Sequence, residues 1–155
     1  MDMQTLPSQT DSRQVPLSLD WIPALKVPGL RVVIIEDSKI ILDRLEESLA
    51  VIRNVEIVGH ADNEPDALLL LRNARWNVAL VDMQLKTGTG IGVLKALGES
   101  AADDRHRIIV FTNYAYPQYE ARCRALGAAH FFDKSRHWNS LLGLITKLAA
   151  GDNAV

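Results

Sequence analysis

Short apolar runs alternate with segments of helical periodicity from residue 31 onward. The runs RVVIIED, NVALVDM and RIIVFTN are continuous and rich in β-branched residues, as in parallel strands that are covered on both faces. AAHFFDK is a shorter run of the same kind. VEIVGHAD alternates apolar with more polar positions, which favours a half-exposed edge strand. The pattern predicts five strands.

Amphipathic helices are predicted between these runs. Apolar residues recur at three- and four-residue steps in the first and the last of them, at Ile41, Leu45, Leu49 and Ile52 and at Leu141, Leu144, Ile145 and Leu148. Asn63, followed by Pro65 and Asp66, predicts the capped start of a helix through Leu71. Gly127 predicts the end of a helix that begins near Gln118.

Five strands alternating with five helices predict a doubly wound α/β domain. Right-handed crossovers then make the sheet parallel and place helices on both of its faces. We assign this domain to residues 30–150. Residues 1–29 contain four prolines and are predicted to be an N-terminal extension or linker, and residues 151–155 a tail.

Composition narrows the classes of function. The chain has 17 basic and 19 acidic residues, a formal net charge of −2, and its basic residues are scattered, so bulk charge does not indicate a nucleic-acid partner. Neither an export signal nor a membrane-spanning apolar run is recognisable, so we expect a cytoplasmic protein without membrane insertion. The single cysteine, Cys123, lies in a helical pattern and is predicted to be a packing residue.

Polar side chains follow four of the predicted strands. They are Glu36 with Asp37, then Asp82, Thr112 and Lys134. Each has an ordinary alternative role as a helix cap, a strand residue or a solvated charge. Because the carboxyl ends of parallel strands share one edge, where ligands of such sheets bind, we expect the five side chains to converge.

The expected cluster has a definite chemistry. Three carboxylates and one ammonium sum to −2, which invites a divalent cation, and oxygen ligands favour Mg²⁺. Thr112 and Lys134 could hold the oxygens of a phosphoryl group, leaving Asp82 as an in-line nucleophile that forms an aspartyl phosphate.

These residues resemble the receiver domain of bacterial response regulators, the family of the single-domain chemotaxis regulator. The resemblance covers roughly residues 30–150 and rests on VVIIEDS, ALVDMQL, VFTN and FFDKS with their spacing. It implies a flavodoxin-like strand order, 2-1-3-4-5. It also implies a stand-alone phosphoacceptor of a two-component system, supplied by a histidine kinase or a histidine phosphotransfer protein. Such a protein signals by phosphorylation-dependent binding of a downstream protein target or by onward phosphotransfer, and is not an enzyme with substrate turnover.

Carried over to this chain, the resemblance implies that Asp82 is the phosphoacceptor. Mg²⁺ would be bound by Asp37, Asp82 and the main-chain carbonyl of Gln84, with Glu36 assisting. Thr112 and Phe131 would form the switch, and Lys134 would pair with the phosphoryl group. Tyr114, Tyr116, Tyr119 and Arg122 are expected near a face made by the fourth helix, fifth strand and fifth helix.

The chain departs from the family at several positions. Glu36 replaces the more frequent Asp, Lys86 stands where a Pro is usual, Asn113 replaces a small residue, and Ser135 stands where a Pro usually follows a cis bond. Two alternatives to phosphorylation signalling therefore stay open. One is a receiver-shaped interaction module that works without phosphorylation. The other, less favoured, is a phosphohydrolase resembling the haloacid dehalogenase family, whose D-x-D motif the first strand lacks.

Two further positions bear on the lifetime of an aspartyl phosphate. In the resembled family, the residues two after the acceptor and two after the Thr tune self-hydrolysis, and here they are Gln84 and Tyr114. A tyrosine ring in the path of the attacking water would obstruct it, and Gln84 has no carboxylate to act as a base. We therefore expect a comparatively long-lived phosphorylated state.

Overall fold

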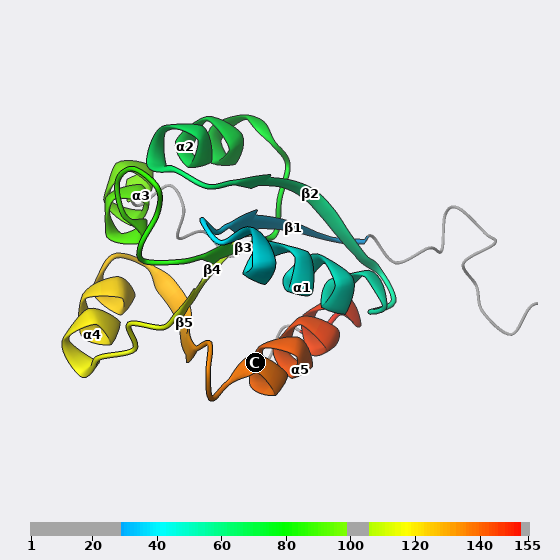
Figure 1. Cartoon of the computed structure of the whole chain (residues 1–155). Coiled ribbons are helices and arrows are strands. Elements are labelled where there is room, and N and C mark those ends of the chain that lie inside the picture. Colours follow the sequence, from blue (N-terminus) through cyan, green and yellow to red (C-terminus); the bar gives the residue numbers. More distant parts are fainter. Residues whose placement is uncertain (1–28, 99–105, 153–155) are drawn as a thin grey trace, which may run out of the picture.

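The computed structural model describes residues 29–98 and 106–152, in which strands and helices alternate along the chain (Figure 1). The predicted extension, apart from Gly29, and most of the predicted tail lie outside the described residues. The elements are β1 (Leu30–Ile35), α1 (Lys39–Ala50), β2 (Val55–Ala61), α2 (Glu64–Asn73), β3 (Val78–Val81), α3 (Gly90–Leu97), β4 (Arg107–Thr112), α4 (Pro117–Ala125), β5 (Ala128–Asp133) and α5 (Trp138–Ala149).

The five strands form one parallel sheet in the order β2-β1-β3-β4-β5. This order confirms the predicted doubly wound fold. The chain moves outward from β1 to β2, returns past β1 to β3 and continues to β4 and β5. The order thus reverses beside β1 and β3, whose carboxyl ends lie next to each other at the centre of the sheet.

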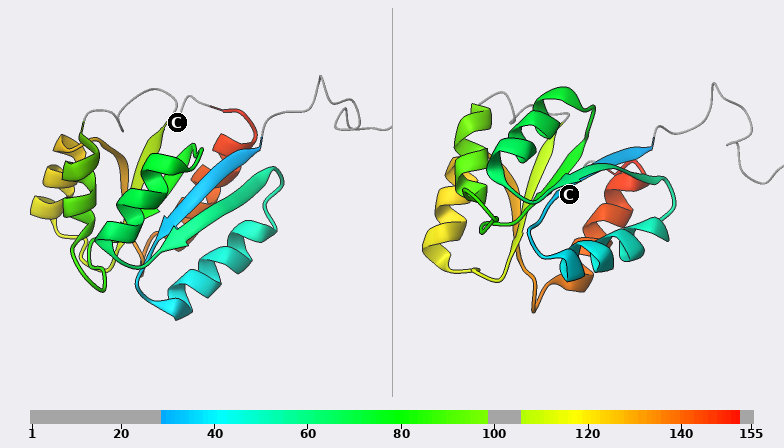
Figure 2. Two further views of the ribbon diagram at one scale, coloured as in Figure 1. Left: turned by 90° about the horizontal axis from the view of Figure 1, so that it is seen from above. Right: turned by 45° about the horizontal axis from the view of Figure 1, so that its top comes forward.

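Helices cover both faces of the sheet, with α1 and α5 on one side and α2, α3 and α4 on the other (Figure 2). The strands β1, β3 and β4 are buried almost throughout because they contribute alternate residues to two apolar clusters. Leu45 of α1 and Ile145 of α5 belong to one cluster, and Leu71 of α2 and Cys123 of α4 to the other. Cys123 is therefore a packing residue, as predicted.

Side-chain caps fix where α1, α2 and α3 begin. The side chain of Ser38 accepts a hydrogen bond from the Ile41 N–H at the start of α1, and that of Asn63 accepts one from the Asp66 N–H, as the sequence predicts for α2. Thr89 caps α3 in the same way, through the Gly92 N–H. In the part of the chain that the structure describes, no helix is both long and apolar enough to span a membrane.

Candidate functional site

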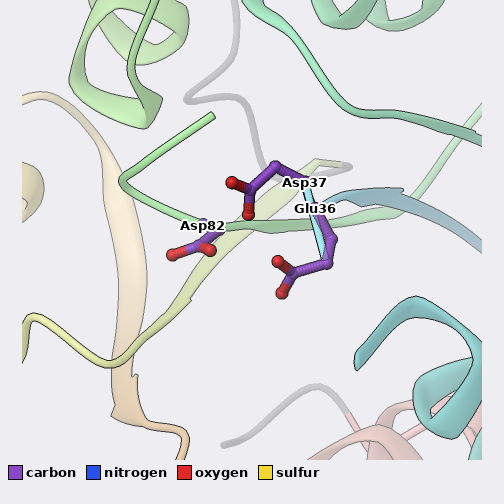
Figure 3. Close-up of side chains that lie close together, drawn as sticks. All are labelled: Glu36, Asp37 and Asp82. Atoms are coloured by element: carbon purple, nitrogen blue, oxygen red, sulfur yellow. The ribbon is translucent and has the colours of Figure 1, made fainter. Parts of the chain in front are cut away.

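Three carboxylates meet where β1 and β3 end. Glu36 and Asp37 directly follow β1, and Asp82 directly follows β3. One oxygen from each lies within 4.8 Å of the others (Figure 3). The main chain sets this arrangement, because the Glu36 N–H donates to the Ala61 carbonyl of β2 and the Asp82 N–H donates to the Ile35 carbonyl of β1, each over 2.9 Å.

Lys134, which directly follows β5, forms ion pairs with two of these carboxylates. Its Nζ lies 2.8 Å from Asp82 Oδ2 and 2.5 Å from Glu36 Oε1. All three side chains are buried, and the Lys134 N–H donates to the Thr112 carbonyl, which anchors the residue next to β4. The remaining oxygen of Asp82 accepts from the Met83 N–H over 2.7 Å.

Burial and ion pairing set the protonation of this cluster. Burial raises the pKa of Glu36 to about 7, against the hydrogen bond from Lys134, which lowers it. Burial alone would lower the pKa of Lys134, but its hydrogen bonds to Asp82 and Glu36 outweigh that effect and raise the pKa above its ordinary value. Lys134 therefore stays charged, while Glu36 retains part of a proton near neutral pH.

The donor set fits a hard divalent cation. Three carboxylates face a single ammonium, so the ionised cluster sums to −2, and the ligand atoms that it offers are all oxygens. Asp37 makes no ion pair with Lys134, and it lies in the wall of the site, where it can reach a metal. The acidic residues predicted for Mg²⁺ are therefore brought together, and Gln84 stands beside them.

A hollow of about 200 Å³ opens over the carboxylates. Its lining consists of Glu36, Asp37, Ser38, Ile41, Asp82, Gln84, Asn113, Tyr114 and Lys134. Ser38 was not predicted from the sequence as a site residue, although its side chain caps α1 and its N–H donates to Glu36 Oε2 over 3.1 Å. Its place three residues before Ile41 in the capping pattern was the available signal.

Thr112 and Phe131 stand apart from this hollow. Thr112 is fully buried, and its Oγ1 accepts a hydrogen bond from the Tyr114 N–H over 3.0 Å. Phe131 packs in the apolar cluster on the side of α4. The two predicted switch residues lie in adjacent strands, since Val110, two residues before Thr112 in β4, pairs with Phe131 of β5. Both are neighbours of the site but do not line the hollow.

Ser135 does not prevent Lys134 from reaching the site. No peptide bond among the described residues is cis, so the bond between Lys134 and Ser135 is trans. The ion pairs of Lys134 with Glu36 and Asp82 form with this backbone.

A second hollow of about 540 Å³ adjoins the first. It is lined by Met83, Gln84, Thr89, Ile91, Tyr114, Tyr119 and Arg122. Tyr119 and Arg122 lie three residues apart and share one face of α4, which here is turned toward α3. The expectation that placed them near the face made by α4, β5 and α5 did not foresee this orientation. Gln84 and Tyr114 line both hollows.

Comparison with known proteins agrees with this geometry. Residues 32–146 match the model of the response regulator receiver domain. The chain is 24% identical over 126 residues to the response regulator GacA of Pseudomonas aeruginosa, and 31% identical over 114 residues to the sensory transduction protein LytT of Bacillus cereus. These alignments cover 81% and 69% of this chain but only 58% and 44% of the two relatives, so the chain spans about half of their length.

Solved structures agree on the fold. A CheY-like response regulator receiver domain protein from Methanospirillum hungatei superposes with a TM-score of 0.68 at 22% identity, over 80% of this chain and 96% of that one. The match to the family model covers most of the chain, and the sheet order and the acidic cluster are those that the resemblance implied. The chain therefore belongs to the family of response regulator receiver domains, which act in two-component systems.

Proposed function

We propose that this receiver domain accepts a phosphoryl group on Asp82 from the phosphohistidine of a histidine kinase or a histidine phosphotransfer protein. The observation that carries the proposal is the position of Asp82. Its carboxylate is held beside Glu36 and Asp37 on one side and Lys134 on the other, in the wall of an open hollow. This setting supports a role for Asp82 as the nucleophile.

In the proposed reaction, a carboxylate oxygen of Asp82 attacks phosphorus in line with the donor nitrogen. The new bond is P–O, the broken bond is P–N, and the imidazole leaves with the electron pair of that bond. Lys134 stays protonated and pairs with a phosphoryl oxygen as negative charge moves from the Asp82 carboxylate to the phosphoryl group. Thr112 would offer its hydroxyl to another oxygen.

Asp37, Asp82 and the Gln84 carbonyl would hold Mg²⁺, with Glu36 assisting. When bound, the ion neutralises charge on the phosphoryl oxygens and on the crowded carboxylates. The chain itself supplies the rest, because the caps and main-chain bonds at the strand ends hold the ligands in place before a donor arrives.

The signal would leave the domain through phosphorylation-dependent binding of a protein target or through onward transfer of the phosphoryl group. The domain would then be a phosphoacceptor without turnover of a separate substrate. We also propose that the protein is cytoplasmic and has no nucleic-acid partner.

The test is phosphorylation by acetyl phosphate in the presence of Mg²⁺, followed by intact-mass analysis. Wild-type protein should gain the mass of one phosphoryl group, and Asp82→Asn should gain none, because an amide of equal size does not attack phosphorus. Asp37→Asn should require more Mg²⁺ for the same extent of reaction. Equal incorporation by wild type and Asp82→Asn would refute the acceptor assignment, and none in either would favour an interaction module that works without phosphorylation.

A further inference from the structure

The loop between Asp82 and α3 is bound along its length to the loop between β2 and α2. The Lys86 N–H donates to the Asp62 carbonyl, and the Glu64 N–H donates to the Thr87 carbonyl, each over 2.9 Å. Lys86 Nζ lies 2.8 Å from Asp62 Oδ2. We call these contacts, together with the Glu64 side chain described next, the loop clasp.

The Glu64 carboxylate fills a recess at the start of α3. Its Oε2 accepts a hydrogen bond from the Thr89 N–H over 3.1 Å. Glycines form the walls: a Cβ on Gly92 would lie 2.5 Å and 2.6 Å from the two Glu64 oxygens, and one on Gly88 would also overlap this carboxylate. Gly88 has a φ of +77°, which favours glycine for a second reason. The recess therefore accepts the carboxylate only because both positions lack a side chain.

The clasp acts on the part of the loop that faces the site. Thr89, which Glu64 holds, forms an antiparallel bridge with Gln84. Gln84 is the residue whose carbonyl would bind Mg²⁺, and it lines the hollow over the carboxylates. Lys86 stands where the family usually has a proline, so here contacts from the loop between β2 and α2 hold a loop that a proline ring would otherwise stiffen.

We propose that Glu64 is a positioning residue of the site, which fixes the Gln84 carbonyl for Mg²⁺ by holding Thr89 from the neighbouring helix. This inference rests on the proposed function, because it presupposes that the carboxylate cluster binds Mg²⁺. Glu64 itself touches neither the metal ligands nor a phosphoryl group. Residues that orient metal ligands without binding the metal commonly change metal affinity 10- to 100-fold when they are replaced.

The first experiment measures Mg²⁺ affinity of the full chain by calorimetry for wild type, Glu64→Ala and Glu64→Gln. Glu64→Ala should bind Mg²⁺ roughly tenfold more weakly, at the lower end of that range, because Gln84 stays bridged to a loop that has lost one anchor. Glu64→Gln keeps an oxygen for the Thr89 N–H and should stay within about threefold of wild type. Glu47→Ala removes an exposed carboxylate from α1 instead and should leave the affinity unchanged.

The second experiment tests the same contact by a substitution in α3. The three atoms nearest to a Cβ at position 92 all belong to the Glu64 side chain, so Gly92→Ala should displace the carboxylate and weaken Mg²⁺ binding like Glu64→Ala. Combined with Glu64→Ala, it should cause no further loss, which is the non-additivity of two changes that break one contact. Hydrogen exchange of the Thr89 amide should quicken in both single variants, with or without metal.

The outcomes separate the two hypotheses. Wild-type protein that binds no Mg²⁺ would overturn the proposed metal site and this inference together. Wild-type affinity in Glu64→Ala, or an equally large loss in Glu64→Gln, would overturn the positioning role alone, since the second result would mean that only the charge matters. Full additivity of Gly92→Ala with Glu64→Ala would also overturn it.

Discussion

Glu36 should make the stability of the metal-free domain depend on pH near neutrality. The side chain is 3% exposed, and burial raises its pKa from the ordinary 4.5 to about 7. Because the folded pKa is the higher one, the stability linked to protonated Glu36 is fully present below pH 4.5 and is lost as pH rises through about 7.

The corresponding measurement is urea unfolding with a chelator present at several pH values, for wild type and Glu36→Gln. The free energy of unfolding of wild type should fall by up to ~3 kcal/mol relative to the variant between acid and mildly alkaline pH. Glutamine keeps the shape and cannot ionise, so it cancels contributions from other groups. Parallel curves for the two proteins would contradict the raised pKa.

Tyr114 is expected to shield an aspartyl phosphate from water. Its side chain is 43% exposed and lines the hollow above Asp82 together with Gln84. Tyr114→Ala should open a path for in-line water and hasten loss of the phosphoryl group severalfold, whereas Tyr116→Ala, which lies outside that lining, should not. The rate is followed by intact mass after removal of the donor in excess Mg²⁺. An unchanged rate in Tyr114→Ala would contradict the shielding hypothesis but would leave the proposed acceptor role of Asp82 unaffected.

At the scale of elements, the connection between β3 and α3 has no room for a side chain at Gly90. The Gly90 N–H donates to the Met83 carbonyl, and a Cβ there would overlap the Asp82 carbonyl and lie 3.0 Å from Met83 Cα. These atoms are main chain and cannot move aside. Gly90→Ala should therefore destabilise the fold by about 1–3 kcal/mol in urea unfolding, despite the better helix propensity of alanine. A gain in stability would show that the loop relaxes freely.

The elements and the cluster of carboxylates could be predicted because both depend on local sequence. Continuous apolar runs identify the buried strands, Asn63 identifies a helix start, and polar residues after parallel strands must share an edge. The recess of Glu64 could not be predicted in this way. It exists only when the start of α2 meets the start of α3, and nothing in the local sequence indicates that Gly88 and Gly92 form its walls. The orientation of Tyr119 likewise depends on how α4 packs.

At the scale of the whole molecule, we expect Thr112 to couple the site to the side of the sheet that carries α4. Its Oγ1 is engaged by the Tyr114 N–H, so movement of the hydroxyl toward a phosphoryl group must break that bond and shift the loop that leads into α4. Mg²⁺ with beryllofluoride, a phosphoryl mimic, should therefore change NMR signals of α4 and of Phe131. Signals of Leu49 and Ile145, in the other apolar cluster, should change little.

Thr112→Ala is the variant that tests this coupling. It should still bind beryllofluoride at Asp82 but should lose most of the response at α4, since the hydroxyl that links the two is gone. Thr146→Ala, which removes an exposed hydroxyl from α5, serves as the control. A response at α4 of wild-type size in Thr112→Ala would mean that the signal travels by another route.

The packing of Trp138 lets its fluorescence report on the face of the sheet that α1 and α5 cover. Its ring lies 5.4 Å from that of Phe111, the residue before Thr112, and the Arg44 guanidinium lies 4.2 Å above it. Trp76 instead neighbours His106, by the opposite ends of β3 and β4. In a chain with phenylalanine at positions 21 and 76, indole emission would come from Trp138 alone. Because the response is expected on the α4 side of the sheet, emission from Trp138 should stay nearly constant on phosphorylation, and a change would show, without any label, that a displacement of β4 reaches the side of α5.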